Sequence, residues 1–161
     1  MKLPEMLRQR LARLPHIRPL FALGVLLPAA LLFAFSIRYH EPWRDEIQAL
    51  LIGRDVPISE LVRAFRLEGV PPLWHLLLKL FCSLFPAPIA LAFAAALGYA
   101  ILLAGTLHLL YVLSRRAIPS ILVMLLLAGT NTYAYELGVV SRPYGIGLGF
   151  VLAAMGELVA A

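Results

Sequence analysis

The sequence predicts an all-α protein, a polytopic bundle of membrane-crossing helices with short amphipathic juxtamembrane helices in its first outer loop. Hydrophobic residues make up 61% of the 161 residues, and the mean hydropathy is +0.86, whereas apolar residues make up about 45–50% of soluble domains. The apolar residues fall in separate runs, with charged residues gathered between them. Because each crossing takes about 20 residues, we expect about four crossings and one loop region in a single membrane domain, residues 1–161.

The basic residues predict the orientation. Five of them precede the first apolar run: Lys2, Arg8, Arg10, Arg13 and Arg18. Such a cluster keeps an N-terminus in the cytoplasm. A cleaved signal peptide is the alternative interpretation, but residues 20–37 lack a clear small-x-small cleavage site, so we expect an anchor that remains. The net charge of +5 is not gathered into a patch with interleaved aromatic residues, so no nucleic-acid partner is expected.

The first two apolar runs differ in length. Residues 20–37 are long enough to cross the membrane outward. Residues 72–85 lie between prolines that leave too few residues for a crossing, and they carry His75 and Lys79. We therefore expect a helix half-buried at the outer surface.

The remaining runs complete the predicted topology. Residues 88–113 cross inward, which places Arg115 and Arg116 in the cytoplasm. Residues 118–133 then cross outward, and residues 145–161 return inward. The last run contains three glycines expected to permit close helix packing, namely Gly145, Gly147 and Gly149.

Residues 39–73 form a polar region between the first two runs. Six of the nine acidic residues lie within it: Glu41, Asp45, Glu46, Asp55, Glu60 and Glu68. Apolar residues recur at helical spacing over residues 47–51 and again over residues 58–65, which predicts two short helices on the outer membrane surface. An ordinary solvated loop is the alternative. A block of ionisable groups at a membrane edge favours a functional site.

Several of these residues suit a transfer reaction at a membrane surface. Asp45 or Glu46 could act as a base or as a ligand of Mg²⁺ or Mn²⁺, since carboxylate oxygens suit hard cations. Arg142 could hold a phosphate, because its planar guanidinium binds phosphate oxygens in pairs. Each has a structural alternative: Asp45 as a helix cap, Arg142 reaching the lipid head groups, and His75 as a polar residue facing the interface.

The order of these motifs resembles the GT-C glycosyltransferases. It consists of a basic N-terminal region, one crossing, an Asp-Glu pair (Asp45 and Glu46), a Pro-Pro-Leu element after Glu68, a span ending in Arg-Arg, and a Ser-Arg-Pro-Tyr element at residues 141–144. The chain looks most like bacterial members similar to the dolichyl-phosphate-mannose protein mannosyltransferases and the lipid A aminoarabinose transferase. The resemblance extends over residues 20–161 and corresponds to the N-terminal part of such enzymes, so we expect a portion of a longer protein.

The resemblance implies roles for particular residues. It makes Asp45 and Glu46 the catalytic pair, with Asp45 and Glu68 as ligands of a divalent cation if one is used. Glu68, His75, Arg142 and Tyr144 become the candidate substrate-binding residues. The sequence departs from the pattern at Val70, where some relatives have a lysine, and at Gly147, where several have an aspartate.

The resemblance also implies a reaction. A sugar would pass from a polyprenyl-phosphate donor to the hydroxyl of a glycan, lipid or protein acceptor, with inversion, on the outer face of a bacterial inner membrane. The partners expected are therefore the lipid-linked sugar and membrane lipids. The alternative is a non-catalytic membrane protein, either a carrier fragment or a lipid-binding assembly factor, in which the acidic pair is dispensable.

Overall fold

The computed structural model describes residues 18–64, 71–140 and 142–161, and these ranges contain helices and no strand. In chain order the elements are α2 (Arg18–Tyr39), α3 (Arg44–Asp55), α4 (Ile58–Ala64), α5 (Pro72–Leu84), α6 (Ala87–Ser114), α7 (Ala117–Ala128), the π-helix η1 (Thr132–Val139) and α8 (Tyr144–Ala160). The expectation of an all-helical chain is confirmed over the described ranges.

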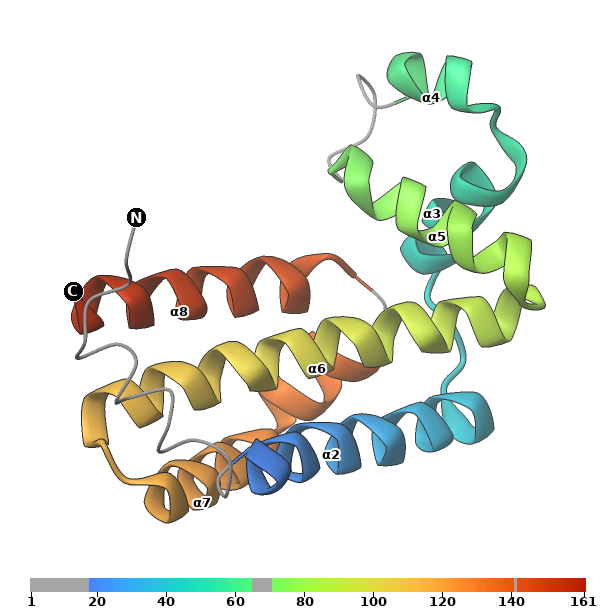
Figure 1. Cartoon of the computed structure of the whole chain (residues 1–161). Helices are drawn as coiled ribbons and strands as arrows, with labels where there is room; N and C mark the ends of the chain where they lie inside the picture. The colour runs from blue at the N-terminus through green and yellow to red at the C-terminus, as the bar shows by residue number, and fades with distance from the viewer. Residues whose placement is uncertain (1–17, 65–70, 141) are drawn as a thin grey trace.

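The helices form two groups (Figure 1). Helices α2, α6, α7 and α8 lie side by side, and α6 contacts α2, α7 and α8. Helices α3, α4 and α5, called the cap below, lie together at the end of this group where α2 ends and α6 begins. The turn between α6 and α7 lies at the opposite end, with the C-terminus of α8.

Two helices are long and apolar enough to cross a membrane. They are Pro19–Tyr39 and Ala87–Ser114, with mean hydropathies of 2.5 and 2.1. Both were predicted as crossings. Helix α8, predicted as the last crossing, is apolar but has only 17 residues.

The predicted crossing over residues 118–133 is wrong as a single helix. Helix α7 ends at Ala128, and η1 continues at an angle of 70° after a short break. The hydroxyl of Thr130 donates to the carbonyl of Leu127 at 2.7 Å and accepts from the N–H of Tyr133 at 3.4 Å. A side chain that satisfies backbone groups in this way competes with the helix and explains the break. If the bent pair is one span, the number of candidate crossings rises to three.

Glycines bring α6 and α8 into backbone contact. A Cβ atom added at Gly149 would lie 2.6 Å from the carbonyl oxygen of Ile101, and one added at Gly105 would collide with the backbone of Gly149. Gly145 likewise faces the backbone of Gly98. Gly147 faces away, with open space around it in the described structure. The predicted role in close packing is therefore confirmed for Gly145 and Gly149 and wrong for Gly147, which lies on another side of the helix.

The cap has its own apolar core, which also joins it to α6. Ala49 and Leu50 of α3, Trp74 and Leu78 of α5, and Leu91 and Ala94 of α6 are its buried members. The three cap helices were predicted. Helix α5 has one face buried in the protein, because Leu78 is fully buried whereas Leu73 is 70% exposed. Its expected position at the outer membrane surface stays a prediction.

Candidate functional site

The first turn of α3 carries the acidic pair. Trp43 is the N-cap residue, and its backbone N–H donates to Oε2 of Glu46 at 2.8 Å. Glu46 thus occupies the third helical position and satisfies a donor that the helix cannot satisfy itself, as in one half of a capping box. The helix-cap alternative considered for Asp45 is wrong, because the capping contact belongs to Glu46.

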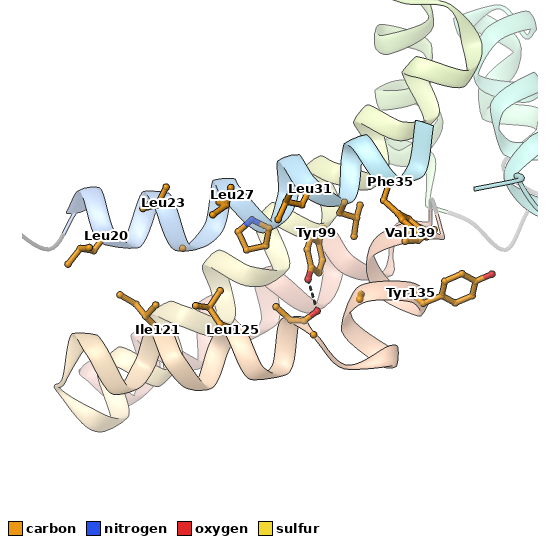
Figure 2. Close-up of a pocket in the computed structure, with 16 residues that line it drawn as sticks. Leu20, Leu23, Leu27, Leu31, Phe35, Tyr99, Ile121, Leu125, Tyr135 and Val139 are labelled. Carbon is orange, nitrogen blue, oxygen red and sulfur yellow. Dashed lines mark hydrogen bonds between the residues drawn. The ribbon is translucent and has the colours of Figure 1, made fainter. Parts of the chain in front are cut away.

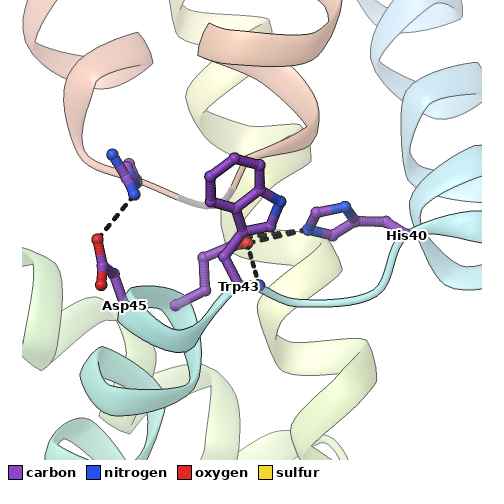
Figure 3. Close-up of polar contacts among 5 residues, drawn as sticks. His40, Trp43 and Asp45 are labelled. Carbon is purple, nitrogen blue, oxygen red and sulfur yellow. Dashed lines mark hydrogen bonds and ion pairs between the residues drawn. The ribbon is translucent and has the colours of Figure 1, made fainter.

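Asp45 instead reaches across the molecule. Nη2 of Arg142 donates to Oδ2 of Asp45 at 2.8 Å, and these two residues are 97 positions apart in the chain. Figure 3 shows this contact at the start of α3, beside the segment that leads into α8. The Asp45 side chain is 70% exposed and that of Arg142 is 30% exposed. Two predicted site residues therefore meet at a position that a substrate could reach.

Glu46 makes a second contact that joins α3 to the end of α2. Nε2 of His40 lies 3.1 Å and 3.2 Å from the two carboxylate oxygens of Glu46 (Figure 3). The side chain of Glu46 is 0% exposed and that of His40 is 8% exposed. Because Glu46 is buried in this way, its carboxylate is a structural anchor for the start of α3, and Asp45 is the accessible member of the pair.

Sequence reasoning did not single out His40. The signal that could have identified its role was local. His40 and Glu46 flank Pro42 and Trp43, so a short turn between the two helices brings an imidazole and a carboxylate together.

The other candidate residues have different surroundings. His75 is fully buried in α5, so the interpretation of it as a residue facing the interface is wrong. Tyr144 is the first residue of α8 and is 57% exposed, two positions after Arg142. Glu68 and Ser141 lie outside the described residues.

The metal hypothesis depends on a residue that the structure does not describe. Within the described ranges, no group of three His, Cys, Asp or Glu side chains is placed to hold a metal ion. Arg142 already binds Oδ2 of Asp45, and a guanidinium so close opposes a second cation by charge repulsion. Mg²⁺ or Mn²⁺ on Asp45 and Glu68 therefore stays a prediction.

Asp55, at the other end of α3, is also acidic and exposed but is bound to its own neighbour. Nε and Nη2 of Arg54 donate to its carboxylate at 2.7 Å and 2.8 Å. These hydrogen bonds hold the pKa of Asp55 below its usual value, and the same contact raises the pKa of Arg54. Arg54 and Asp55 both belong to α3, whereas Asp45 and Arg142 join α3 to the segment that leads into α8.

A long apolar groove runs between α2 and the α7–η1 pair (Figure 2). Its volume is about 810 Å³, within the range of ligand pockets. The α2 wall includes Leu20, Leu23, Leu27, Leu31 and Phe35, and Ile121, Leu125, Tyr135 and Val139 lie on the opposite wall. It therefore extends along most of α2 toward the end of the bundle that carries the cap.

Comparison of the chain with protein-family models, with curated proteins and with solved structures gives no match.

Proposed function

We propose that this chain is the site-bearing part of a polytopic membrane glycosyltransferase of the GT-C type. It transfers a sugar from a polyprenyl-phosphate donor to an acceptor hydroxyl, on the outer face of a bacterial inner membrane. The contact between Asp45 and Arg142 carries the proposal, because it joins an accessible carboxylate and an accessible guanidinium from distant parts of the chain. The apolar groove supports it, since a polyprenyl tail needs an apolar surface along the bundle.

The two side chains have complementary tasks. Arg142 exchanges its contact with Asp45 for the donor phosphate, whose oxygens its planar fork can bind in pairs. This releases Oδ2 of Asp45, which accepts the proton of the acceptor hydroxyl. The acceptor oxygen then forms a bond to the anomeric carbon as the bond from that carbon to the phosphate oxygen breaks. The lipid phosphate leaves with the bonding electrons, and Arg142 stabilises its charge.

Glu46 serves this reaction indirectly. It is buried and bound to the N–H of Trp43 and to His40, so it fixes the first turn of α3, from which Asp45 projects. Tyr144 and Arg142 lie close together in the chain at the start of α8, which suits Tyr144 for contact with the donor. Glu68 and His75 remain predicted substrate-binding residues.

The first test is Asp45→Asn, with Asp55→Asn as the matched control. Both variants remove one exposed carboxylate from α3, but Asp55 is paired only with the adjacent Arg54. If Asp45 is the general base, its loss slows transfer about 10²- to 10⁴-fold, while Asp55→Asn keeps the wild-type rate. The assay uses the full-length protein in membranes, with a labelled polyprenyl-phosphate sugar and matched protein amounts.

Loss of the exposed pair with Arg142 changes stability by only about 0–1 kcal/mol, so a large fall in rate would not reflect unfolding. Equal rates for wild type and Asp45→Asn would leave the carboxylate without a catalytic task. The non-catalytic alternative, a lipid-binding protein, would then be favoured.

The second test concerns orientation, which rests on the basic N-terminal residues and on Arg115 and Arg116. In a Cys82→Ser background, Pro57→Cys and Glu136→Cys should react with an impermeant thiol reagent added to intact cells, and Arg116→Cys should not. All three positions are exposed. Glu136 is chosen over Gly138 of the same helix as the labelling position, because a Cβ atom added at Gly138 would lie 2.5 Å from the side chain of Leu32. Labelling at residue 116 from outside would reverse the proposed orientation.

A further inference from the structure

The apolar groove ends beside a cation that the proposed transfer reaction does not use. On α2 the residues that line the groove recur at helical spacing from Leu20 to Phe35. Arg38 lies seven residues, about two turns, after Leu31, so it belongs to the same face of the helix. It is one of the exposed residues at the end of α2. The groove therefore continues, at its end nearer the cap, onto a guanidinium.

Aromatic rings connect this guanidinium to the groove wall. The ring centroids of Phe35 and Tyr39 are 5.3 Å apart, and Cζ of Arg38 lies 5.9 Å from the centre of the Tyr39 ring. Among the described residues Arg38 forms no ion pair with a carboxylate, whereas Arg54 and Arg142 both do. Its charge is therefore available to an anion at the mouth of the groove.

Along its length the groove offers very few polar partners. Of the described residues that line it, only Tyr99 and Tyr135 have polar side chains. The hydroxyl of Tyr99 already donates to the carbonyl of Ala128 at 2.8 Å, and Figure 2 shows the ring of Tyr135 pointing out of the groove. The groove thus suits an apolar chain whose single polar group lies at the end, beside Arg38.

The dimensions suit one acyl chain. From Leu20 to Phe35 the helix rises about 22 Å, more than the roughly 15 Å of one leaflet of the hydrocarbon core. If a methylene group is taken to be as large as a water molecule, about 30 Å³, a chain of about 18 carbons fills about 540 Å³. The groove holds about 810 Å³, so it accepts one such chain and is too small for two.

The head group decides which lipid binds. A tail gains little by leaving the bilayer for the groove, because bilayer hydrocarbon is as apolar as leucine. Preference between lipids with equal tails therefore comes from the contact at Arg38. A guanidinium binds the paired oxygens of an anionic group and stays charged near a membrane. Phospholipids have anionic groups but carry two chains, whereas a fatty acid has one chain and one carboxylate.

We propose that the groove and Arg38 form a binding site for long-chain fatty acids, whose carboxylate binds the guanidinium of Arg38. The site recognises a chain and a charge, and it contacts no sugar. Fatty acids therefore compete with the polyprenyl-phosphate donor for the groove. This competition rests on the proposed function, whereas the binding of fatty acids does not.

The test compares oleic acid with oleyl alcohol, each with a photoreactive group in its chain. The purified full-length protein in phosphatidylcholine nanodiscs is irradiated with either probe at alkaline pH, where the acid is ionised, and the labelled peptides are identified. Half-maximal labelling of the groove should need about fivefold less acid than alcohol, the ratio expected for one basic side chain near a membrane surface. Arg38→Gln should remove this preference and leave labelling by the alcohol unchanged. Arg44→Gln, at an exposed arginine outside the groove lining, should retain it.

Leu31→Trp tests the position of the chain. Leu31 is 63% exposed and lines the groove, so an indole there should reduce labelling by both probes. Unlabelled oleate should displace the acid probe, whereas phosphatidylglycerol, which has two chains, should not. Arg38→Gln changes only an exposed side chain, so it decides the matter even if Leu31→Trp does not fold.

Three outcomes would each overturn the proposal: equal labelling by acid and alcohol, an acid preference that survives in Arg38→Gln, or displacement by phosphatidylglycerol as effective as that by oleate. None of these measurements requires sugar transfer. Their failure is therefore separate from a failure of the proposed function, which Asp45→Asn tests.

Discussion

The interface between α6 and α8 differs from the interface between α2 and α7. Between α6 and α8 the backbones touch, because Gly105 and Gly149 have no side chain to separate them. At Gly24 of α2, the atoms of α7 nearest to an added Cβ atom belong to side chains. Gly24 is closest to the ends of Met124 and Ile121, at 3.5 Å and 3.7 Å from an added Cβ atom.

The interface between α6 and α8 is therefore closed, whereas a groove lies open between α2 and α7. Leucines on α2 beside the groove remain exposed, among them Leu23 at 58%, Leu27 at 52% and Leu31 at 63%. The bend after α7 directs η1 away from the α7 axis by 70°, and η1 also contacts α2. In a membrane, lipid is as apolar as leucine, so close backbone packing is what joins two helices. The glycines thus determine which interface is closed.

Gly149→Ala gives the largest expected effect on this comparison. The added methyl group would lie 2.6 Å from the carbonyl oxygen of Ile101, and the opposing atoms are backbone, which cannot move aside as a side chain can. Overpacking of this kind destabilises by about 1–3 kcal/mol. Unfolding of the purified protein in detergent, followed by circular dichroism, measures the change.

Gly147→Ala is the matched control, two positions away on the same helix. The space around Gly147 in the described structure is open, and alanine is a better helix former than glycine by about 0.8–1 kcal/mol. The two variants should therefore change stability in opposite directions. A loss of stability in both would mean that α8 does not dock through the face seen here.

These glycines also show how far the sequence could predict the fold. Apolar runs and helical spacing correctly predicted the helices, because both features are local. The glycine-rich character of residues 145–149 predicted close packing, but only the position of α6 reveals that Gly147 faces away. The break after Ala128 was missed although Gly129, Thr130, Asn131 and Thr132 interrupt the apolar run at that point. The hydroxyl of Thr130 satisfies backbone groups there.

Leu27→Trp tests the open interface. Leu27 lines the groove, and an indole there would fill part of the space proposed for the polyprenyl tail. We expect crosslinking of a photoreactive polyprenyl phosphate to require about tenfold more lipid, which corresponds to about 1.4 kcal/mol. The control is Leu26→Trp, at a leucine that is 62% exposed but is not part of the groove lining. Equal crosslinking of both variants would assign the lipid tail to another surface.

The candidate site was predictable to a smaller extent than the fold. The resemblance to GT-C enzymes grouped Asp45 with Arg142, and the structure places these two side chains in contact. The sequence alone did not show which of the two neighbouring acidic residues, Asp45 or Glu46, is buried. That depends on the capping geometry of α3, in which Glu46 turns back to Trp43 and His40. The partnership with His40 requires the turn between α2 and α3, whose shape no periodic pattern encodes.

Tyr99→Phe has the smallest expected effect and tests what holds the edge of the groove. The hydroxyl of Tyr99 donates to the carbonyl of Ala128 at 2.8 Å, where α7 ends (Figure 2). Hydrogen bonds between membrane helices contribute about 0.6 kcal/mol on average, so the melting temperature should fall by about 1–2 °C. Tyr39→Phe, at a ring that is 70% exposed, removes an equivalent hydroxyl and should have no effect.

Because phenylalanine keeps the ring that lines the groove, lipid crosslinking should not change in either variant. Reduced crosslinking in Tyr99→Phe alone would show that this hydrogen bond holds the end of α7 in the position that keeps the groove open.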